Sequence, residues 1–193
     1  ICLAIPKNEI KKYPKISKNP NNTTKMCVNL ESGNFKITDI ITPSKYDIKL
    51  DKNSVKPGGQ LAEKMVSGVY ISELFRLILK DTLKTNSNLK SLPKNSLTAE
   101  HMSNIEEDTS SNLENIKNIF TNLNLETDLE TRKLIQKICT LISNRSAKIA
   151  ATCIIGAIKK IDPNLKNQHT IAIDGSIFEK YYNYKQRLQE TIN

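Results

Sequence analysis

The chain has 193 residues, of which 38% are hydrophobic and 25% are charged, and its formal net charge is +9 at pH 7. This length and composition are sufficient for one sizeable hydrophobic core, and they exclude an intrinsically disordered chain. No uninterrupted apolar run approaches the roughly 20 residues that a membrane-spanning helix needs, so we expect no membrane span.

The positive charge is spread along the whole chain and is not gathered in one segment. Proteins that bind single-stranded nucleic acids combine basic segments with aromatic side chains that stack on bases, and the sequence has no such combination. We therefore expect no nucleic-acid partner, and the charge suits an anionic small molecule. A basic module that binds another macromolecule stays open as an alternative.

The four cysteines, Cys2, Cys27, Cys139 and Cys153, occur singly, without a C-x-x-C pair and without a histidine at ligand spacing. This pattern predicts neither disulfides nor a metal site. Cys139 and Cys153 lie in apolar helical sequence and are expected to be core residues of a reduced, cytoplasmic protein. The chain lacks an initiating methionine and the pattern of a secretory leader, so we expect it to begin within a longer protein.

The amino-terminal region begins with a short apolar stretch that we expect to be buried, and residues 6–25 form a Lys- and Asn-rich loop. Residues 25–30 are predicted to form a strand, which ends at Glu31, Ser32 and Gly33. An acid at the carboxyl end of a strand is either part of an ordinary turn or a residue of a binding loop, because α/β proteins collect their chemistry at such ends.

Residues 57–79 are predicted to form one buried helix. The segment opens with Pro57 and two glycines, and its apolar residues then recur at helical spacing. Glu63 lies in the first turns among apolar neighbours, so its carboxylate either faces solvent or meets a polar partner. Residues 35–56, which precede the helix, contain only short apolar pieces.

Three more helices are predicted after this one. The first begins near Ala99 with Ser96 as its cap, and the second covers residues 112–122 with one apolar face. The longest covers residues 128–161, and Thr127 or Asp128 can cap it. Small residues in its second half would allow a sheet to pack closely against it; they are Ala147, Ala150, Ala151, Gly156 and Ala157.

Residues 170–173 are predicted to form a buried strand, followed directly by Asp174, Gly175 and Ser176 and then by a helical run. A glycine and a serine at the start of a helix present free backbone N–H groups to an anion. The sequence has neither a G-x-G-x-x-G nor a G-x-x-x-x-G-K-[ST] motif, so the common dinucleotide-binding and P-loop sites are not expected.

Three stretches together resemble the large domain of eukaryotic hexokinases and glucokinases. They are residues 26–35 (MCVNLESGNF), 57–68 (PGGQLAEKMVSG) and 173–181 (IDGSIFEKY). Their order and spacing match, and the resemblance covers nearly the whole chain outside the loop at residues 6–25. It implies an α/β fold of the actin-like or ribonuclease H-like ATPase class, with residues 1–193 as a helix-rich part of the large domain that is incomplete at both ends.

The resemblance also implies a site. Glu31 and Glu63 would accept hydrogen bonds from glucose hydroxyls, and the nucleotide side would be lined by Gly68, Ser103, Asp174, Gly175 and Ser176. The implied activity is the ATP-dependent phosphorylation of glucose and other hexoses at the 6-hydroxyl, the first step of glycolysis, with Mg²⁺ as the companion of ATP.

The sequence departs from the family pattern at Ser32 and Ala62, where aromatic residues are common, and at Ala99, where threonine is typical. The family's Gly-rich phosphate segments and its general-base aspartate lie outside this sequence. We therefore expect no catalytic residue in this chain and no activity from the chain alone. A hexokinase-like protein that binds glucose or has a regulatory role without catalysis is an alternative.

Overall fold

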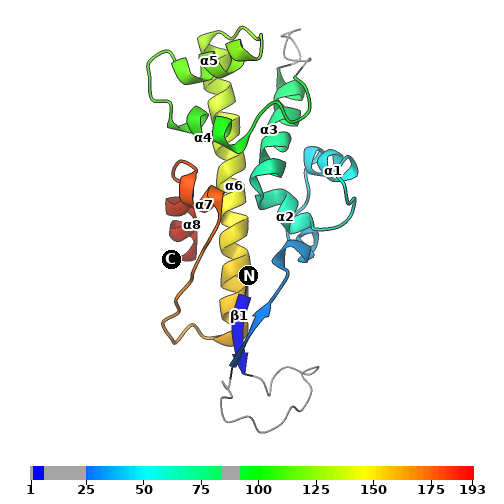
Figure 1. The fold of residues 1–193 in the computed structure, drawn as a ribbon, viewed down its shortest axis with the longest axis vertical. Helices are drawn as coiled ribbons and strands as arrows, with labels where there is room; N and C mark the ends of the chain where they lie inside the picture. Colours follow the sequence, from blue (N-terminus) through cyan, green and yellow to red (C-terminus); the bar gives the residue numbers. More distant parts are fainter. Residues whose placement is uncertain (1, 7–24, 84–91) are drawn as a thin grey trace.

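The computed structural model describes residues 2–6, 25–83 and 92–193, and helices dominate in these parts (Figure 1). Two antiparallel strands, in which Cys2 pairs with Asn29, lie at one end of an elongated molecule. The strands are β1 (Cys2–Pro6) and β2 (Lys25–Asn29). The helices are α1 (Lys45–Lys52), α2 (Leu61–Val66), α3 (Gly68–Thr82), α4 (Ala99–Glu107), α5 (Glu114–Asn122), α6 (Leu129–Ile161), α7 (Ser176–Lys180) and α8 (Tyr184–Ile192).

Helix α6 runs along the long axis of the molecule, and α2, α3, α4, α5 and α8 contact it (Figure 1). The helix begins after Asp128, whose side chain accepts a hydrogen bond of 2.7 Å from the backbone N–H of Thr131. Such a cap satisfies one of the four N–H groups that a helix start leaves free. The helix ends at Ile161, shortly before Pro163, which cannot continue the helical hydrogen bonds. Both ends confirm the sequence prediction.

The main core lies between α6 and the helices around it. Its largest fully buried side chains include Phe75 of α3, Met102 of α4, Phe120 of α5 and Ile135 of α6. Burying an apolar side chain of this size contributes about 1.5–3 kcal/mol relative to its exposure, so these contacts fix the helices around α6.

Helices pack against Ala147 and Ala151 of α6, where the sequence predicts a sheet, whereas Gly156 of the same stretch is exposed. Ala147 and Ala151 are fully buried, and the neighbouring Ser146 donates a hydrogen bond of 3.1 Å to the carbonyl oxygen of Val66 in α2. Small side chains permit the close approach of a helix or of a strand, so the pattern alone does not distinguish the two.

By length and composition alone, α6 could cross a membrane, and no other helix in the described parts of the chain could do so. Of its most apolar 18-residue window, 39% is buried within the protein. The expected absence of a membrane span therefore stays a prediction.

The predicted single helix over residues 57–79 is two helices, α2 and α3. The break lies at Ser67, whose backbone is extended at φ −67° and ψ 140°. The next residue, Gly68, packs against α4 and α7, so tertiary contacts there favour a new helix start over a continuous helix.

The cap of α4 is Thr98 and not Ser96. The Thr98 hydroxyl accepts a hydrogen bond of 3.1 Å from the backbone N–H of His101, and the His101 ring accepts one of 3.3 Å from the Thr98 N–H. Helix α1 was not predicted from the sequence, although Ser44 and Asp47 form a capping box at its start. At both helix starts, the side chain three residues after the cap accepts a hydrogen bond from the backbone N–H of the cap residue. This spacing is the sequence pattern of a capping box.

Two other local predictions are wrong. Residues 170–173 form no strand, and Thr170, Ile171 and Ala172 are exposed. In the described part of the chain, the sheet consists of β1 and β2, and residues 170–173 do not pair with either strand. The apolar start of the chain forms β1, in which Cys2 and Ala4 are exposed and not buried.

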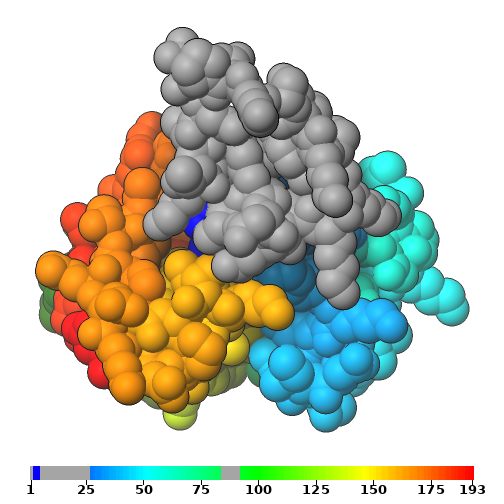
Figure 2. All heavy atoms as spheres, turned by 90° about the horizontal axis from the view of Figure 1, so that it is seen from below, coloured from blue at the N-terminus to red at the C-terminus, as the bar shows by residue number. Residues whose placement is uncertain are grey.

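Figure 2 views the molecule from the end that carries the strands. The segment that follows α6 and the segment between β2 and α1 lie on opposite sides of this end. The predicted loop at residues 6–25 lies almost entirely outside the described residues. The strand predicted for residues 25–30 is confirmed as β2.

Candidate functional site

A cavity of about 950 Å³ lies where several segments that are distant in the sequence meet. Its walls come from the turn after β2, from α2, from the starts of α3, α4 and α7, from the middle of α6 and from α8. Polar and small residues that line it include Ser32, Gly33, Glu63, Ser67, Gly68, Thr98, Gly175 and Ser176. Four of the seven predicted site residues are in this set.

Glu63 lies in the first turn of α2, and its half-buried side chain borders the cavity. The turn after β2 approaches it closely, since a Cβ atom on Gly33 would lie 3.2 Å from the Glu63 Cβ and 3.3 Å from its Oε2. The glycine therefore allows the strand end and the start of α2 to meet at this carboxylate.

Glu31 stands beside the cavity but does not line it. Its carboxylate accepts a hydrogen bond from the Asn29 side-chain amide, and its own backbone N–H donates one of 3.2 Å to the Asn29 Oδ1. The backbone of Glu31 is left-handed, with φ 46°. Such a conformation costs a non-glycine residue about 1–3 kcal/mol, so the surrounding turn must hold it in place. Ser32 and Gly33, which follow it, line the cavity.

Three helix starts meet at Gly68. A Cβ atom there would lie 3.0 Å from the Ala99 Cβ, at the start of α4, and 3.0 Å from the Ile177 Cδ1, in the first turn of α7. Helix starts carry free N–H groups and the positive end of the helix dipole. Their convergence at one wall makes that wall suited to a negatively charged ligand.

Ser103 and Asp174 do not line the cavity, unlike the other predicted nucleotide residues. The Ser103 hydroxyl accepts a hydrogen bond of 2.9 Å from the backbone N–H of Tyr182, just after α7. Asp174 is exposed and directly precedes Gly175 and Ser176, which do line the cavity. The roles of all these residues remain predictions.

The residues that line the cavity without being predicted for the site include Asn95, Thr98 and Cys153. Thr98 and Asn95 come from the turn before α4, where Asn95 has a left-handed backbone with φ 60°. The third is Cys153, which was expected to be a core residue; it is half-buried on the cavity side of α6. Burial raises the pKa of its thiol, which favours the neutral form.

A hydrogen-bonded chain holds α8 and α6 against α2 near the cavity. Because Ser146 donates its single proton to the Val66 carbonyl oxygen, the Tyr184 hydroxyl must donate to the Ser146 Oγ, at 2.8 Å. Ser146 and Tyr184 are buried, and Val66 and Tyr184 line the cavity. The position of α2, and with it Glu63, is thus coupled to α8.

Comparisons with known proteins agree with this architecture. Residues 2–193 match the model of the family described as hexokinase. The chain is 36% identical over 175 residues to a hexokinase of Kluyveromyces lactis and 33% identical over 190 residues to hexokinase-7 of Oryza sativa subsp. japonica. These alignments cover 86% and 93% of this chain but 36% and 41% of the relatives, so the chain spans about two fifths of their length.

The fold agrees with that of a solved structure, the hexokinase from Schistosoma mansoni complexed with glucose. The TM-score is 0.83 at 21% sequence identity, over 99% of this chain and 44% of that protein. The likeness shows that the chain has a helix-rich part of the actin-like ATPase fold of hexokinases. With a family model that matches all but the first residue, the chain belongs to the hexokinase family.

Proposed function

We propose that this chain is the large-domain part of an ATP-dependent hexokinase, which transfers the γ-phosphoryl group of ATP to the 6-hydroxyl of glucose or a related hexose. The observation that carries the proposal is the cavity itself. One wall has the Glu63 carboxylate, and another has the converging starts of α3, α4 and α7. An acceptor of sugar hydroxyls thus borders the same space as a wall suited to phosphates.

On the sugar side, Glu63 and Glu31 would accept hydrogen bonds from glucose hydroxyls. A hydrogen bond to a charged group contributes about 1.5–3 kcal/mol, and one carboxylate can accept from two adjacent hydroxyls. Glu63 already borders the cavity, whereas Glu31 would have to exchange the hydrogen bond from Asn29 for one from the sugar.

On the nucleotide side, Gly68, Gly175 and Ser176 would approach the phosphates of ATP through backbone N–H groups. Asp174 and Ser103 would support this wall from outside the cavity. ATP would enter as its Mg²⁺ complex, because Mg²⁺ is usually held by substrate phosphates and water. Among the described residues, no group of three or more potential metal ligands is present.

In this reaction, the chain would hold the hexose and ATP in alignment and would stabilise the charge of the phosphoryl group. Phosphoryl transfer depends chiefly on the alignment of the attacking and leaving oxygens and on stabilisation of the phosphoryl charge. A cavity that holds the hexose and the phosphates side by side supplies this alignment. We propose that the general base comes from a part of the protein outside this chain, and that the enzyme acts in the cytoplasm.

The test is a substitution of Glu63 in the complete kinase. We expect Glu63→Ala to raise the KM for glucose strongly, by about a hundredfold or more if two charge-assisted hydrogen bonds are lost. Glu100→Ala is the matched control, since Glu100 is an exposed acid in the first turn of α4 and should leave the glucose KM unchanged. If the Glu63→Ala variant bound glucose as tightly as the wild type, the assignment of the sugar site would be wrong.

A hexokinase-like protein that binds glucose without catalysis is the second candidate, because the general base would lie elsewhere. Glucose would then raise the melting temperature of the complete protein while no glucose 6-phosphate formed from ATP. A basic interaction module would instead be retained on heparin in a salt-dependent way and would gain no stability from glucose.

A further inference from the structure

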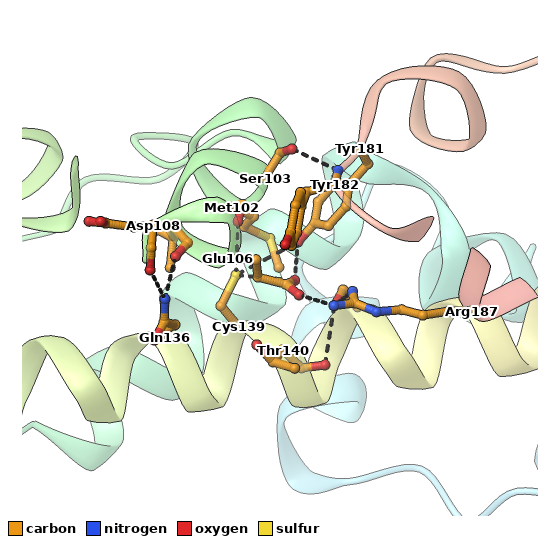
Figure 3. A network of polar contacts seen from close by, with 12 residues as sticks. Met102, Ser103, Glu106, Asp108, Gln136, Cys139, Thr140, Tyr181, Tyr182 and Arg187 are labelled. Carbon is orange, nitrogen blue, oxygen red and sulfur yellow. Dashed lines mark hydrogen bonds and ion pairs between the residues drawn. The ribbon is translucent and has the colours of Figure 1, made fainter. Parts of the chain in front are cut away.

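We propose that Glu106 is a positioning residue for the nucleotide side of the cavity. Together with Tyr181 and Arg187, it fixes α7, and therefore Gly175 and Ser176, against α4. This inference rests on the function proposed above. Figure 3 shows this cluster, and none of its three residues lines the cavity.

The carboxylate of Glu106 is enclosed and fully engaged. Its side chain is 1% exposed. The Tyr181 hydroxyl donates a hydrogen bond of 2.6 Å to its Oε1, and the Arg187 guanidinium pairs with its Oε2. One buried acid on α4 thus holds Tyr181, the residue that follows α7, and Arg187 of α8 (Figure 3).

Burial keeps the two neighbouring weak acids, the Tyr181 phenol and the Cys139 thiol, in their neutral forms. Burial raises the pKa of the Tyr181 hydroxyl, with the nearby Cys139 and Glu106 adding to the effect, so the phenol remains a donor. Burial also raises the pKa of the Cys139 thiol, which lies 3.3 Å from the Met102 carbonyl oxygen. Arg187, which extends to Ser143 of α6 at 2.7 Å, is then the cation that balances the carboxylate.

A second attachment lies one helical turn away. Ser103 is three residues before Glu106, and therefore on the same side of α4, and its hydroxyl accepts a hydrogen bond from the Tyr182 N–H. Two successive residues at the end of α7 are thus tied to two successive turns of α4. Two attachments fix orientation as well as distance, which a single hydrogen bond does not.

The position of α7 is transmitted directly to the cavity because α7 has only five residues. Ser176 begins the helix and lines the cavity, and Tyr181 follows its last residue. A shift of α7 would move Ser176 relative to Gly68, which Ile177 in the first turn of α7 approaches closely. A displacement of about 1 Å at a binding group can reduce catalysis about a hundredfold.

Stability alone would not require this cluster. Well-packed apolar residues are often at least as stable as a buried ion pair, whereas loss of one partner leaves an unpaired buried charge. A fully hydrogen-bonded buried group also fixes one geometry. The cluster therefore suits a place where α4 and α7 must meet in a single register.

Tyr181→Phe in the complete kinase is the main test, since it removes one hydroxyl and keeps the packing of the ring. We expect the KM for ATP to rise about tenfold or more, while the KM for glucose changes by less than about twofold. Arg187→Lys keeps the charge but loses the forked geometry, so it should give a smaller rise than Arg187→Met.

Asp47→Asn is the matched control. It weakens the Asp47–Arg145 ion pair, at 2.7 Å, which joins α1 to α6 at another place. We expect it to lower the melting temperature without changing the KM for ATP. If Tyr181→Phe behaved in the same way, or raised both KM values equally, the cluster would be only structural and the inference would be overturned.

Direct binding separates this inference from the proposed function. Titration of wild-type and Tyr181→Phe kinase with Mg-ADP needs no turnover. Weaker binding to the variant supports the positioning role, even if the wild type forms no glucose 6-phosphate and the proposed activity fails. Equal binding to both proteins, or no binding to the wild type, overturns it.

Discussion

Gly68 is the residue at which three helices come closest, and its missing side chain is what permits the contact. A methyl group there would lie 3.0 Å from atoms of Ala99 and Ile177. Carbon atoms at this distance repel, so Ala99 and the Ile177 side chain would have to give way by a few tenths of an ångström. At an uncrowded helix position, replacement of glycine by alanine would instead stabilise the protein, because alanine is the better helix former.

We therefore predict opposite results for two Gly→Ala substitutions. Gly68→Ala should destabilise the protein by about 1–3 kcal/mol, the usual cost of overpacking. Gly156→Ala should stabilise it by about 0.5–1 kcal/mol, because Gly156 lies within α6 and, in the described part of the chain, no atom beyond its own stretch of helix lies within 4 Å of a Cβ placed there. Urea denaturation measures both. A stabilised Gly68→Ala variant would contradict the close approach of the three helix starts.

At the scale of the elements, the sequence indicates where most helices lie but not always where they begin. The start of α4 is an example, because Ser96 and Thr98 are both residue types that cap helices. The structure gives the cap to Thr98, while the Ser96 hydroxyl is buried and, among the described residues, has no hydrogen-bond partner.

This difference leads to a second pair of substitutions. Thr98→Ala should cost about 1 kcal/mol of stability, because the His101 N–H loses its acceptor. Ser96→Ala should be neutral or slightly stabilising, since it removes a buried hydroxyl that makes no hydrogen bond. Thermal unfolding of the two variants beside the wild type checks this. If Ser96→Ala were less stable than Thr98→Ala, Ser96 and not Thr98 would be the cap of α4.

The residue pattern predicted α6 and its cap because periodicity and a capping residue are local signals. It did not predict the break at Ser67, since that break depends on Gly68 meeting α4 and α7, which lie about 30 and 110 residues further along the chain. Glu63, by contrast, could be recognised from the sequence as an acid among apolar neighbours. Its place beside Gly33 and the three helix starts required the tertiary structure.

At the scale of the molecule, buried or hydrogen-bonded acids tie the outer segments to α6. Burial alone would raise the pKa of Asp47, but hydrogen bonds from Arg145 of α6 and from Ser44 outweigh it and lower that pKa. Asp162 follows the last residue of α6. Hydrogen bonds from the Asn167 backbone, and from His169, lower its pKa to about 2.

The sign of the pH dependence follows from these shifts. A carboxyl whose pKa is lower in the folded protein binds its proton more weakly there than in the unfolded chain, where the value is near 3.8. Its contribution is thus fully present above that value and is lost as the pH falls from about 3.8 towards 2. We expect the urea midpoint to fall steeply between pH 4 and pH 2.5.

Asp162→Asn should make this acid dependence shallower, because asparagine has no proton to gain. The variant should be less stable than the wild type at pH 6 and closer to it at pH 2.5. Glu179→Gln is the control, since Glu179 is an exposed acid of α7 and should leave the slope unchanged. Parallel curves for Asp162→Asn and the wild type would mean that the turn after α6 does not contribute to acid unfolding, and that carboxyls such as Asp47 account for it.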